Sequence, residues 1–217
     1  MRVSLAVVVV AALFARPTIS QAQICLGTAS FSTGPMRVAA AFNVGDQAKG
    51  YGAQFAAGAA KGAFGSVSVT RISYDEIDEG STDFGISAGY SFDTDSKGKA
   101  QFCPVADFTY EKQPDFGGVE SSAHSFGLGG AFGGIVSSSP NFDFVPFVSG
   151  MYTRASVSAS FEGFSESLNQ NYGVFTLGAG FVVNHTVTIQ PAASFPVGLD
   201  GAKPTYGISV GFNFGSR

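Results

Sequence analysis

The sequence is short of charge. Asp, Glu, Lys and Arg make up 13% of its 217 residues, about half the share found in a typical soluble domain. Trp is absent. The net charge is −4 and there is no basic stripe, so the chain is not expected to bind nucleic acid. Hydrophobic residues make up 45% of the chain, yet no internal segment is long and apolar enough for a transmembrane helix. An ordinary soluble domain and a helical membrane protein are therefore both poor fits.

Glycine and phenylalanine are abundant, with 29 and 22 residues. A chain that is poor in charge, rich in Gly and aromatic residues, and without spanning helices fits a β-barrel in a bilayer. Lipid rather than water then faces its outer surface. The length allows one domain, and nothing in the sequence suggests a second.

The first residues have the features of an export signal. Arg2 supplies a positive charge, Leu5–Phe14 form a short apolar run, and Ile19–Ala22 offer small residues for cleavage. We expect cleavage after Ala22. The chain then has three parts: a signal peptide (1–22), a periplasmic N-terminal segment (23–35) and an outer-membrane barrel (36–214).

The chain contains two cysteines, Cys25 and Cys103. Both would enter an oxidising compartment after export, which predicts a disulfide between them. The bond would hold residues 23–35 against the lower mouth of the barrel, either as a staple on a loose N-terminus or as part of a narrowed pore. Two separate thiols, buried as small hydrophobic groups, are the alternative.

Ten segments alternate in hydrophobicity with the two-residue period of β-strands. Their lengths are close to the ~9–11 residues that a tilted strand needs to cross a bilayer. The expected strands are Met36–Gly45, Gly50–Gly58, Ala63–Tyr74, Asp83–Phe92, Ala100–Glu111, Ser122–Gly134, Phe142–Arg154, Asn171–Val183, Thr186–Phe195 and Thr205–Phe214. Eight strands are the alternative if the first two segments are misassigned.

The last expected strand shows the alternation best. One face carries only Gly, Ser and Asn, and the other carries Tyr206, Ile208, Val210, Phe212 and Phe214. A soluble antiparallel sheet places charged residues on its watery face, but here neither face is charged. The pattern therefore predicts an all-β protein, a transmembrane antiparallel up-and-down β-barrel with a lipid-facing exterior and a narrow polar interior.

Connection lengths and aromatic residues predict how the barrel sits in the membrane. If the first strand runs outward, both termini are periplasmic and the longest connections, including 75–82, 112–121 and 155–170, lie outside. Aromatic girdles mark both edges of such barrels, and Phe falls mainly at the expected periplasmic ends. Six of the seven tyrosines fall at the expected outer ends: Tyr51, Tyr74, Tyr110, Tyr152, Tyr172 and Tyr206.

With this pattern the chain resembles the broad family of small outer-membrane β-barrels that includes the OmpA transmembrane domain and the opacity-type surface proteins. The resemblance covers the chain from Met36 onward. Its sharpest element is Tyr206–Phe214, which is similar to the C-terminal aromatic signal that such proteins present to the outer-membrane insertion machinery; Tyr206, Phe212 and Phe214 would carry it. This chain departs from the pattern by adding three residues, 215–217, after the last aromatic residue.

Membership would imply an outer-membrane location, contact with lipid and lipopolysaccharide, and machinery-assisted folding. It would not imply one activity, because members of the family serve as pores, adhesins, envelope anchors and occasional enzymes.

Three charged residues, Arg37, Asp107 and Glu111, are expected to face the lumen. Opposite charges there could pair for stability, since unpaired buried charges are costly, or form a selectivity filter. The other lumen positions are small, and they either leave a thin water-filled path or serve curvature and tight packing. They are Gly85, Ser87, Gly89, Gly127, Gly129, Ala131, Gly178, Gly180, Gly207, Ser209 and Gly211.

Two further groups have possible chemistry. The acidic residues Asp75, Glu76, Asp78, Glu79 and Asp83 are expected to form a solvated outer loop, with divalent cations as the alternative ligand. The available conventional bases are His124 and His185. A Ser-His-Asp site around His124 could draw on Ser121, Ser122, Ser125 and Asp115, but a triad is recognised by geometry.

The expected function is a structural or surface-interaction role in the outer membrane, with the extracellular loops carrying any binding. The Ser-rich segment 155–170, with Phe161 and Phe164, is the longest of these loops. A narrow porin-like channel for small solutes is the alternative, and an outer-membrane hydrolase at the rim around His124 is a further one. No cofactor and no metal site are expected, and the sequence does not indicate the extracellular partner.

Overall fold

The computed structural model describes residues 36–46, 48–58, 62–75, 77–94, 99–113, 120–161 and 164–214. The expected signal peptide, the N-terminal segment and Cys25 lie outside these ranges, so the cleavage site stays a prediction. No helix in the described ranges has the length and apolar character needed to cross a membrane.

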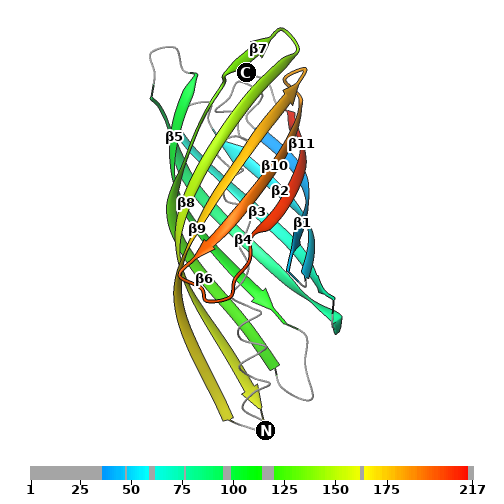
Figure 1. The fold of residues 1–217 in the computed structure, drawn as a ribbon, viewed down its shortest axis with the longest axis vertical. Coiled ribbons are helices and arrows are strands. Elements are labelled where there is room, and N and C mark those ends of the chain that lie inside the picture. Colours follow the sequence, from blue (N-terminus) through cyan, green and yellow to red (C-terminus); the bar gives the residue numbers. More distant parts are fainter. Residues whose placement is uncertain are drawn as a thin grey trace.

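The fold consists of β-strands that follow one another along the chain (Figure 1). Alternating side chains and turn-forming breaks account for this order. The strands are β1 (Met36–Gly45), β2 (Ala48–Gly58), β3 (Gly62–Tyr74), β4 (Ile77–Asp93), β5 (Ala100–Lys112), β6 (Glu120–Gly134), β7 (Ser137–Ser139), β8 (Phe142–Phe161), β9 (Phe164–Val183), β10 (Val187–Val197) and β11 (Thr205–Phe214).

Ten of these strands close into an antiparallel barrel. Each pairs with its neighbour in sequence, the first pairs with the last (β1 with β11), and β6 pairs directly with β8. The short β7 pairs only with the start of β8, within the connection between β6 and β8. The predicted ten-stranded up-and-down barrel is confirmed. Closure leaves the wall without an unpaired edge at membrane depth.

The two ends of the barrel differ. At one end, the terminal end, lie Met36 and Phe214, where the barrel begins and finishes, together with the turn 184–186. At the other, the hairpin end, β8 and β9 extend as a long antiparallel ribbon that remains paired as far as Phe161 and Phe164 (Figure 1). Which end faces the outside of the cell stays a prediction.

Strand boundaries agree with the sequence prediction for β1 and β11 and differ most at the hairpin end. The expected loop 155–170 is largely strand, because β8 continues to Phe161 and β9 begins at Phe164. The expected loop 75–82 is also mostly strand, since β4 begins at Ile77. The sequence prediction of long loops is therefore wrong for these two segments.

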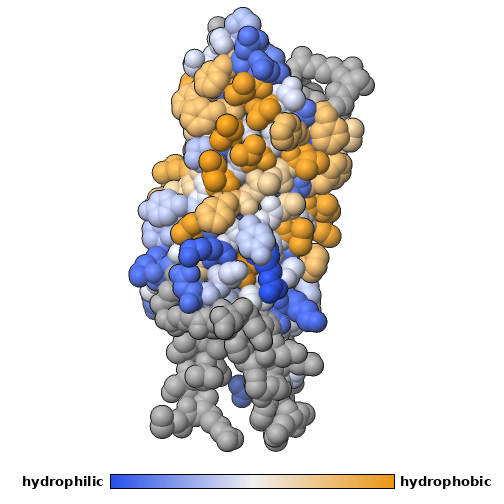
Figure 2. Space-filling model, turned by 90° about the vertical axis from the view of Figure 1, so that its right-hand side faces the viewer, coloured by the Kyte–Doolittle hydropathy of each residue, from blue (hydrophilic) through white to orange (hydrophobic). Residues whose placement is uncertain are grey.

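The outer face of the barrel is apolar. Figure 2 shows a broad hydrophobic band, with hydrophilic residues gathered beyond it toward each end. Outward-facing side chains on every barrel strand are exposed, among them Val38 (47%), Ile86 (61%) and Leu128 (54%). In water so much exposed apolar surface would be unfavourable, whereas in lipid it is the expected surface.

The aromatic girdles are partly as predicted. Tyr51, Tyr110, Tyr152 and Tyr206 are exposed toward the hairpin end, and six phenylalanines are exposed toward the terminal end: Phe92, Phe102, Phe132, Phe142, Phe212 and Phe214. Tyr172 lies toward the same end, but it is buried (9% exposed) on the inner face of β9 and does not join the exposed girdle. Tyr74 is also not fully exposed, and its hydroxyl lies 3.3 Å from the buried Ser81 Oγ.

Candidate functional site

The lumen wall is lined by polar side chains that bond to one another between neighbouring strands. Gln54 Nε2 donates to Ser66 Oγ (3.1 Å), which lies 2.8 Å from Ser87 Oγ on the next strand. Thr176 Oγ1 and Ser194 Oγ make a similar contact of 2.8 Å between β9 and β10. These bonds satisfy polar groups that point into the barrel.

The three charged residues expected in the lumen lie on the inner faces of their strands. Arg37, Asp107 and Glu111 have exposures of 1%, 4% and 7%. The expected pairing of Arg37 with an acidic side chain is not found among the described residues. Its Nη2 donates to Ser209 Oγ at 3.5 Å, while Nε and Nη1 have no partner there.

Small lumen residues do not by themselves open a path through the barrel. A Cβ added at Gly178 would come within 2.6 Å of Phe147 Cε1, and one at Gly89 would come 2.5 Å from Phe64 Cζ. Both pairs are register partners on adjacent strands. Glycine therefore makes room for a large side chain from the next strand, which favours the tight-packing interpretation.

Cys103 lies on the inner face of β5 and has no exposed surface. It belongs to a cluster of buried apolar side chains toward the terminal end, together with Val105, Ala131, Val145 and Phe147. This cluster holds the sulfur in a fixed position near the barrel mouth. The bond to Cys25 stays a prediction, because Cys25 is outside the described residues.

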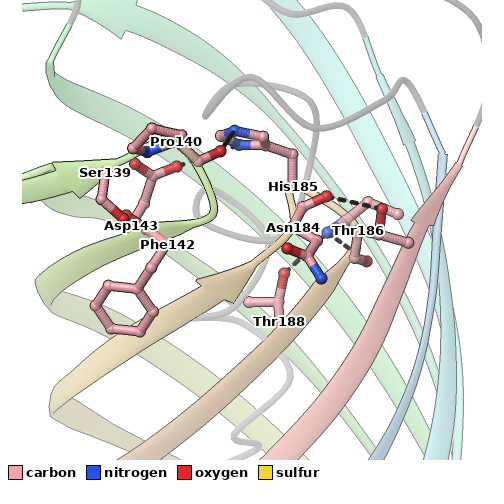
Figure 3. Close-up of polar contacts among 9 residues, drawn as sticks. Ser139, Pro140, Phe142, Asp143, Asn184, His185, Thr186 and Thr188 are labelled. Atoms are coloured by element: carbon pink, nitrogen blue, oxygen red, sulfur yellow. Dashed lines mark hydrogen bonds and ion pairs between the residues drawn. The ribbon is translucent and has the colours of Figure 1, made fainter.

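A polar cluster fastens the turns of the terminal end (Figure 3). His185 Nδ1 lies 3.5 Å from Asp143 Oδ2, and its Nε2 lies 3.0 Å from the carbonyl oxygen of Pro140. On the other side of the turn, Asn213 Nδ2 donates to Thr188 Oγ1 at 2.9 Å. Both ring nitrogens of His185 face acceptors, so the cluster is suited to holding turns together rather than activating a nucleophile.

Among the described residues, His124 is not brought into a Ser-His-Asp arrangement. It is exposed and lies on the outer face of β6, the face that also carries Phe126 and Leu128. Ser121 Oγ instead donates to Gln113 Oε1 at 2.6 Å. Asp115 is outside the described residues.

The acidic residues near the start of β4 do not act as one group. Asp75 forms an exposed ion pair with Lys49 at 3.1 Å, whereas Asp83 is buried (8% exposed) on β4. The side chains of Glu76, Asp78 and Glu79 are outside the described part. In that part, no three His, Cys, Asp or Glu residues are grouped so that they could hold a metal.

The hairpin end carries a three-stranded extension, formed by residues 120–125 of β6, 155–161 of β8 and 164–171 of β9. β8 and β9 have 20 residues each, about twice the ~9–11 residues that cross a bilayer. β6 remains paired with β8 as far as Ser160. The extension is rich in Ser, Asn and Gln, so it fits water rather than lipid.

One edge of this extension is open. β10 pairs with β9 only from Val183 to Gly173, whereas β8 pairs with β9 all the way to Phe164. From Phe164 to Asn171, β9 is thus paired on one side only within the described chain. The sequence prediction missed this edge, although the alternation of Ala and Val with Ser in residues 155–160 could have indicated a continuing strand.

The base of the extension is firmly packed. Ala155 (7%), Val157 (4%) and Tyr172 (9%) are buried on its inner face. Leu199, from the connection between β10 and β11, packs against them. The open edge is therefore carried by a sheet with its own small apolar core.

The C-terminal strand has the arrangement that its sequence predicts. Tyr206 (60%), Phe212 (56%) and Phe214 (42%) are exposed on the outer face, and β11 closes the barrel against β1. Their role as an insertion signal stays a prediction.

The closed barrel, its apolar outer band and its polar lumen together define a small ten-stranded outer-membrane β-barrel. No known protein family and no curated protein matches the sequence.

Solved outer-membrane barrels are similar in fold. The N-terminal barrel domain of Pseudomonas aeruginosa OprF has 11% identity and a TM-score of 0.43, covering 84% of this chain and 100% of its own. The KdgM porin has 10% identity and a TM-score of 0.44, covering 82% and 99%. The attachment invasion locus protein Ail of Yersinia pestis has 13% identity and a TM-score of 0.39, and the match covers 82% of this chain and 95% of Ail.

Proposed function

We propose that this protein is a surface-interaction barrel: the barrel anchors the three-stranded extension, and the open edge of β9 binds an extended segment of a partner. The observation that carries the proposal is the one-sided pairing of β9 from Phe164 to Asn171. Unpaired N–H and C=O groups along a strand edge are a template for adding another strand. This assignment places the hairpin end outside the cell.

The edge has the size and character that strand addition needs. Its eight residues span about 26 Å, and it carries neither Lys nor Pro, residues that commonly protect an edge. Of its described side chains, Glu166 alone is charged, and Leu168 is 49% exposed. The backbone would therefore supply most of the affinity, while Leu168 would add an apolar contact.

Selection of peptides on the refolded barrel tests the proposal. Phage-displayed ten-residue peptides are selected on the wild-type protein and tested again on a variant in which 156–169 is replaced by Asn-Gly. Ala155 and Gln170 are register partners, so the short turn joins them where β8 and β9 leave the barrel wall, and the truncation also removes the β8 partners of residues 120–124 of β6. Selected peptides should bind wild type, lose at least tenfold in affinity for the truncated variant, and slow hydrogen exchange of the amides of 164–171.

A pair of point variants provides a finer control. Adjacent N–H groups of a strand point to opposite edges, so of Ser167→Pro and Leu168→Pro one removes an outward N–H and the other removes a bond to β8. The variant that removes an outward N–H should fold normally, as judged by heat-dependent gel mobility, and should lose peptide binding. Peptides that bind all variants equally, or that protect other amides, would show that the edge is not the binding surface.

A further inference from the structure

Arg37 is a buried positive charge in the lumen without a negative partner in the described chain. Its side chain is 1% exposed, and its one hydrogen bond, to Ser209 Oγ, is 3.5 Å long, at the far limit of such bonds. Its Nε and Nη1 have no partner. A buried ion normally requires a close counter-charge, because desolvation is otherwise uncompensated.

A second buried donor lies on the other side of the same serine. Gln190 has no exposed surface, and its Nε2 has no partner in the described part of the chain. Its Oε1 accepts a bond from Ser209 Oγ at 3.5 Å. β11 lies between β1 and β10, so strands on both sides of Ser209 contribute N–H groups that lack acceptors.

The wall is shaped around the guanidinium. A Cβ at Gly211 would lie 2.7 Å from Arg37 Nη2 and 2.8 Å from its Cζ, so any larger residue at this position would displace the Arg37 side chain. An arginine in such a position is well suited to bind a carboxylate or phosphate group, because these groups accept several charge-assisted hydrogen bonds.

We propose that Arg37 and Gln190 form an oxyanion-binding site in the lumen, with a carboxylate or phosphate group as the ligand. The site is separate from the open edge of β9 and stands or fails independently of it. The oxyanion has two possible sources: a solute that enters the barrel, or a carboxylate of this chain outside the described residues.

The experiment uses the full-length mature protein refolded in detergent, with heat-dependent gel mobility reporting the unfolding midpoint. Sodium acetate and sodium phosphate are titrated at an ionic strength held constant with sodium chloride. For a solute ligand, the midpoint should rise saturably, Arg37→Gln should raise the apparent Kd at least tenfold, and Gln190→Leu should raise it severalfold. Arg71→Gln is the matched control, because Arg71 is exposed on the outer face and donates to Thr82.

For an internal ligand, the midpoint should not respond to added anions, but Arg37→Gln should lower it while Arg71→Gln does not. Arg37→Lys then introduces an amine that a zero-length carbodiimide can join to a neighbouring carboxylate, and mass spectrometry identifies the joined residue. This arm also serves if Arg37→Gln fails to fold. The proposal is overturned if added anions have no effect, no cross-link forms, and Arg37→Gln unfolds at the same temperature as Arg71→Gln.

Discussion

Gly129 and Gly150 lie on neighbouring strands, β6 and β8. A side chain at Gly129 would point into the lumen, whereas one at Gly150 would point away from it. A Cβ at Gly129 would meet the carbonyl oxygen of Gly150, and it would come 2.5 Å from Met151 Sδ. A Cβ at Gly150 would meet nothing within 4 Å. The two positions therefore separate the effect of losing glycine from the effect of crowding the lumen.

We expect Gly129→Ala to lower the free energy of unfolding by about 1–3 kcal/mol, because a backbone atom cannot move aside as a flexible side chain can. Gly150→Ala should leave stability unchanged or raise it by about 0.5 kcal/mol, since alanine loses less conformational entropy than glycine. Urea unfolding of both variants in lipid vesicles measures the difference. Equal stabilities would contradict the packing of the lumen described above.

The sequence predicted which face of a strand a residue lies on better than it predicted which side chains that residue contacts. Alternation alone places Arg37, Asp107 and Glu111 on inner faces, since side chains alternate along a strand. It does not reveal that Arg37 lies over Gly211 and next to Ser209, because that contact depends on how β1 meets β11 when the barrel closes. Register between the first and last strands is a long-range property that no local pattern encodes.

The turn between β9 and β10 shows how one element is set by its backbone. Asn184 and His185 have φ angles of 50° and 54°, the left-handed conformation that two-residue hairpins favour. Asn184→Gly should keep stability within about 0.5 kcal/mol, whereas Asn184→Val should lose about 1–2 kcal/mol, because β-branched residues are strained there.

Asn171→Val on β9 is the matched control, since valine suits an extended strand and Asn171 is exposed within one. Equilibrium unfolding of the three variants in the same vesicles compares them. If Asn171→Val costs as much as Asn184→Val, the loss arises from replacing asparagine rather than from the backbone of the turn.

Elements were predicted best where they cross the membrane. Strands such as β1 and β11 alternate apolar with small residues, and both have the predicted bounds. The outer parts of β8 and β9 were predicted as a loop because beyond the lipid their outward positions become Ser and Asn, which removes the apolar signal. The position of Tyr172 along its strand was predicted correctly, but its side chain lies on the inner face rather than in the exposed girdle.

For the molecule as a whole, the main question is whether the barrel serves as an anchor or as a channel. Ten strands could enclose a water-filled path, but the lumen positions of Gly89, Gly178 and Gly129 are covered by Phe64, Phe147 and Met151 from adjacent strands. We therefore expect the folded barrel, inserted in planar bilayers, to show no discrete conductance steps. Heat-dependent gel mobility would first establish that it has folded.

Reduction of the expected Cys25–Cys103 bond separates two causes of a silent barrel. If the packed lumen wall itself excludes ions, dithiothreitol should leave the bilayer silent, and Phe147→Ala should not open it while Met151 and Phe64 remain. If the bond holds the N-terminal segment in the mouth, reduction should produce steps that Cys103→Ser also produces without reductant. Such steps would favour the porin-like alternative and give the lumen, rather than the extension, the main part in function.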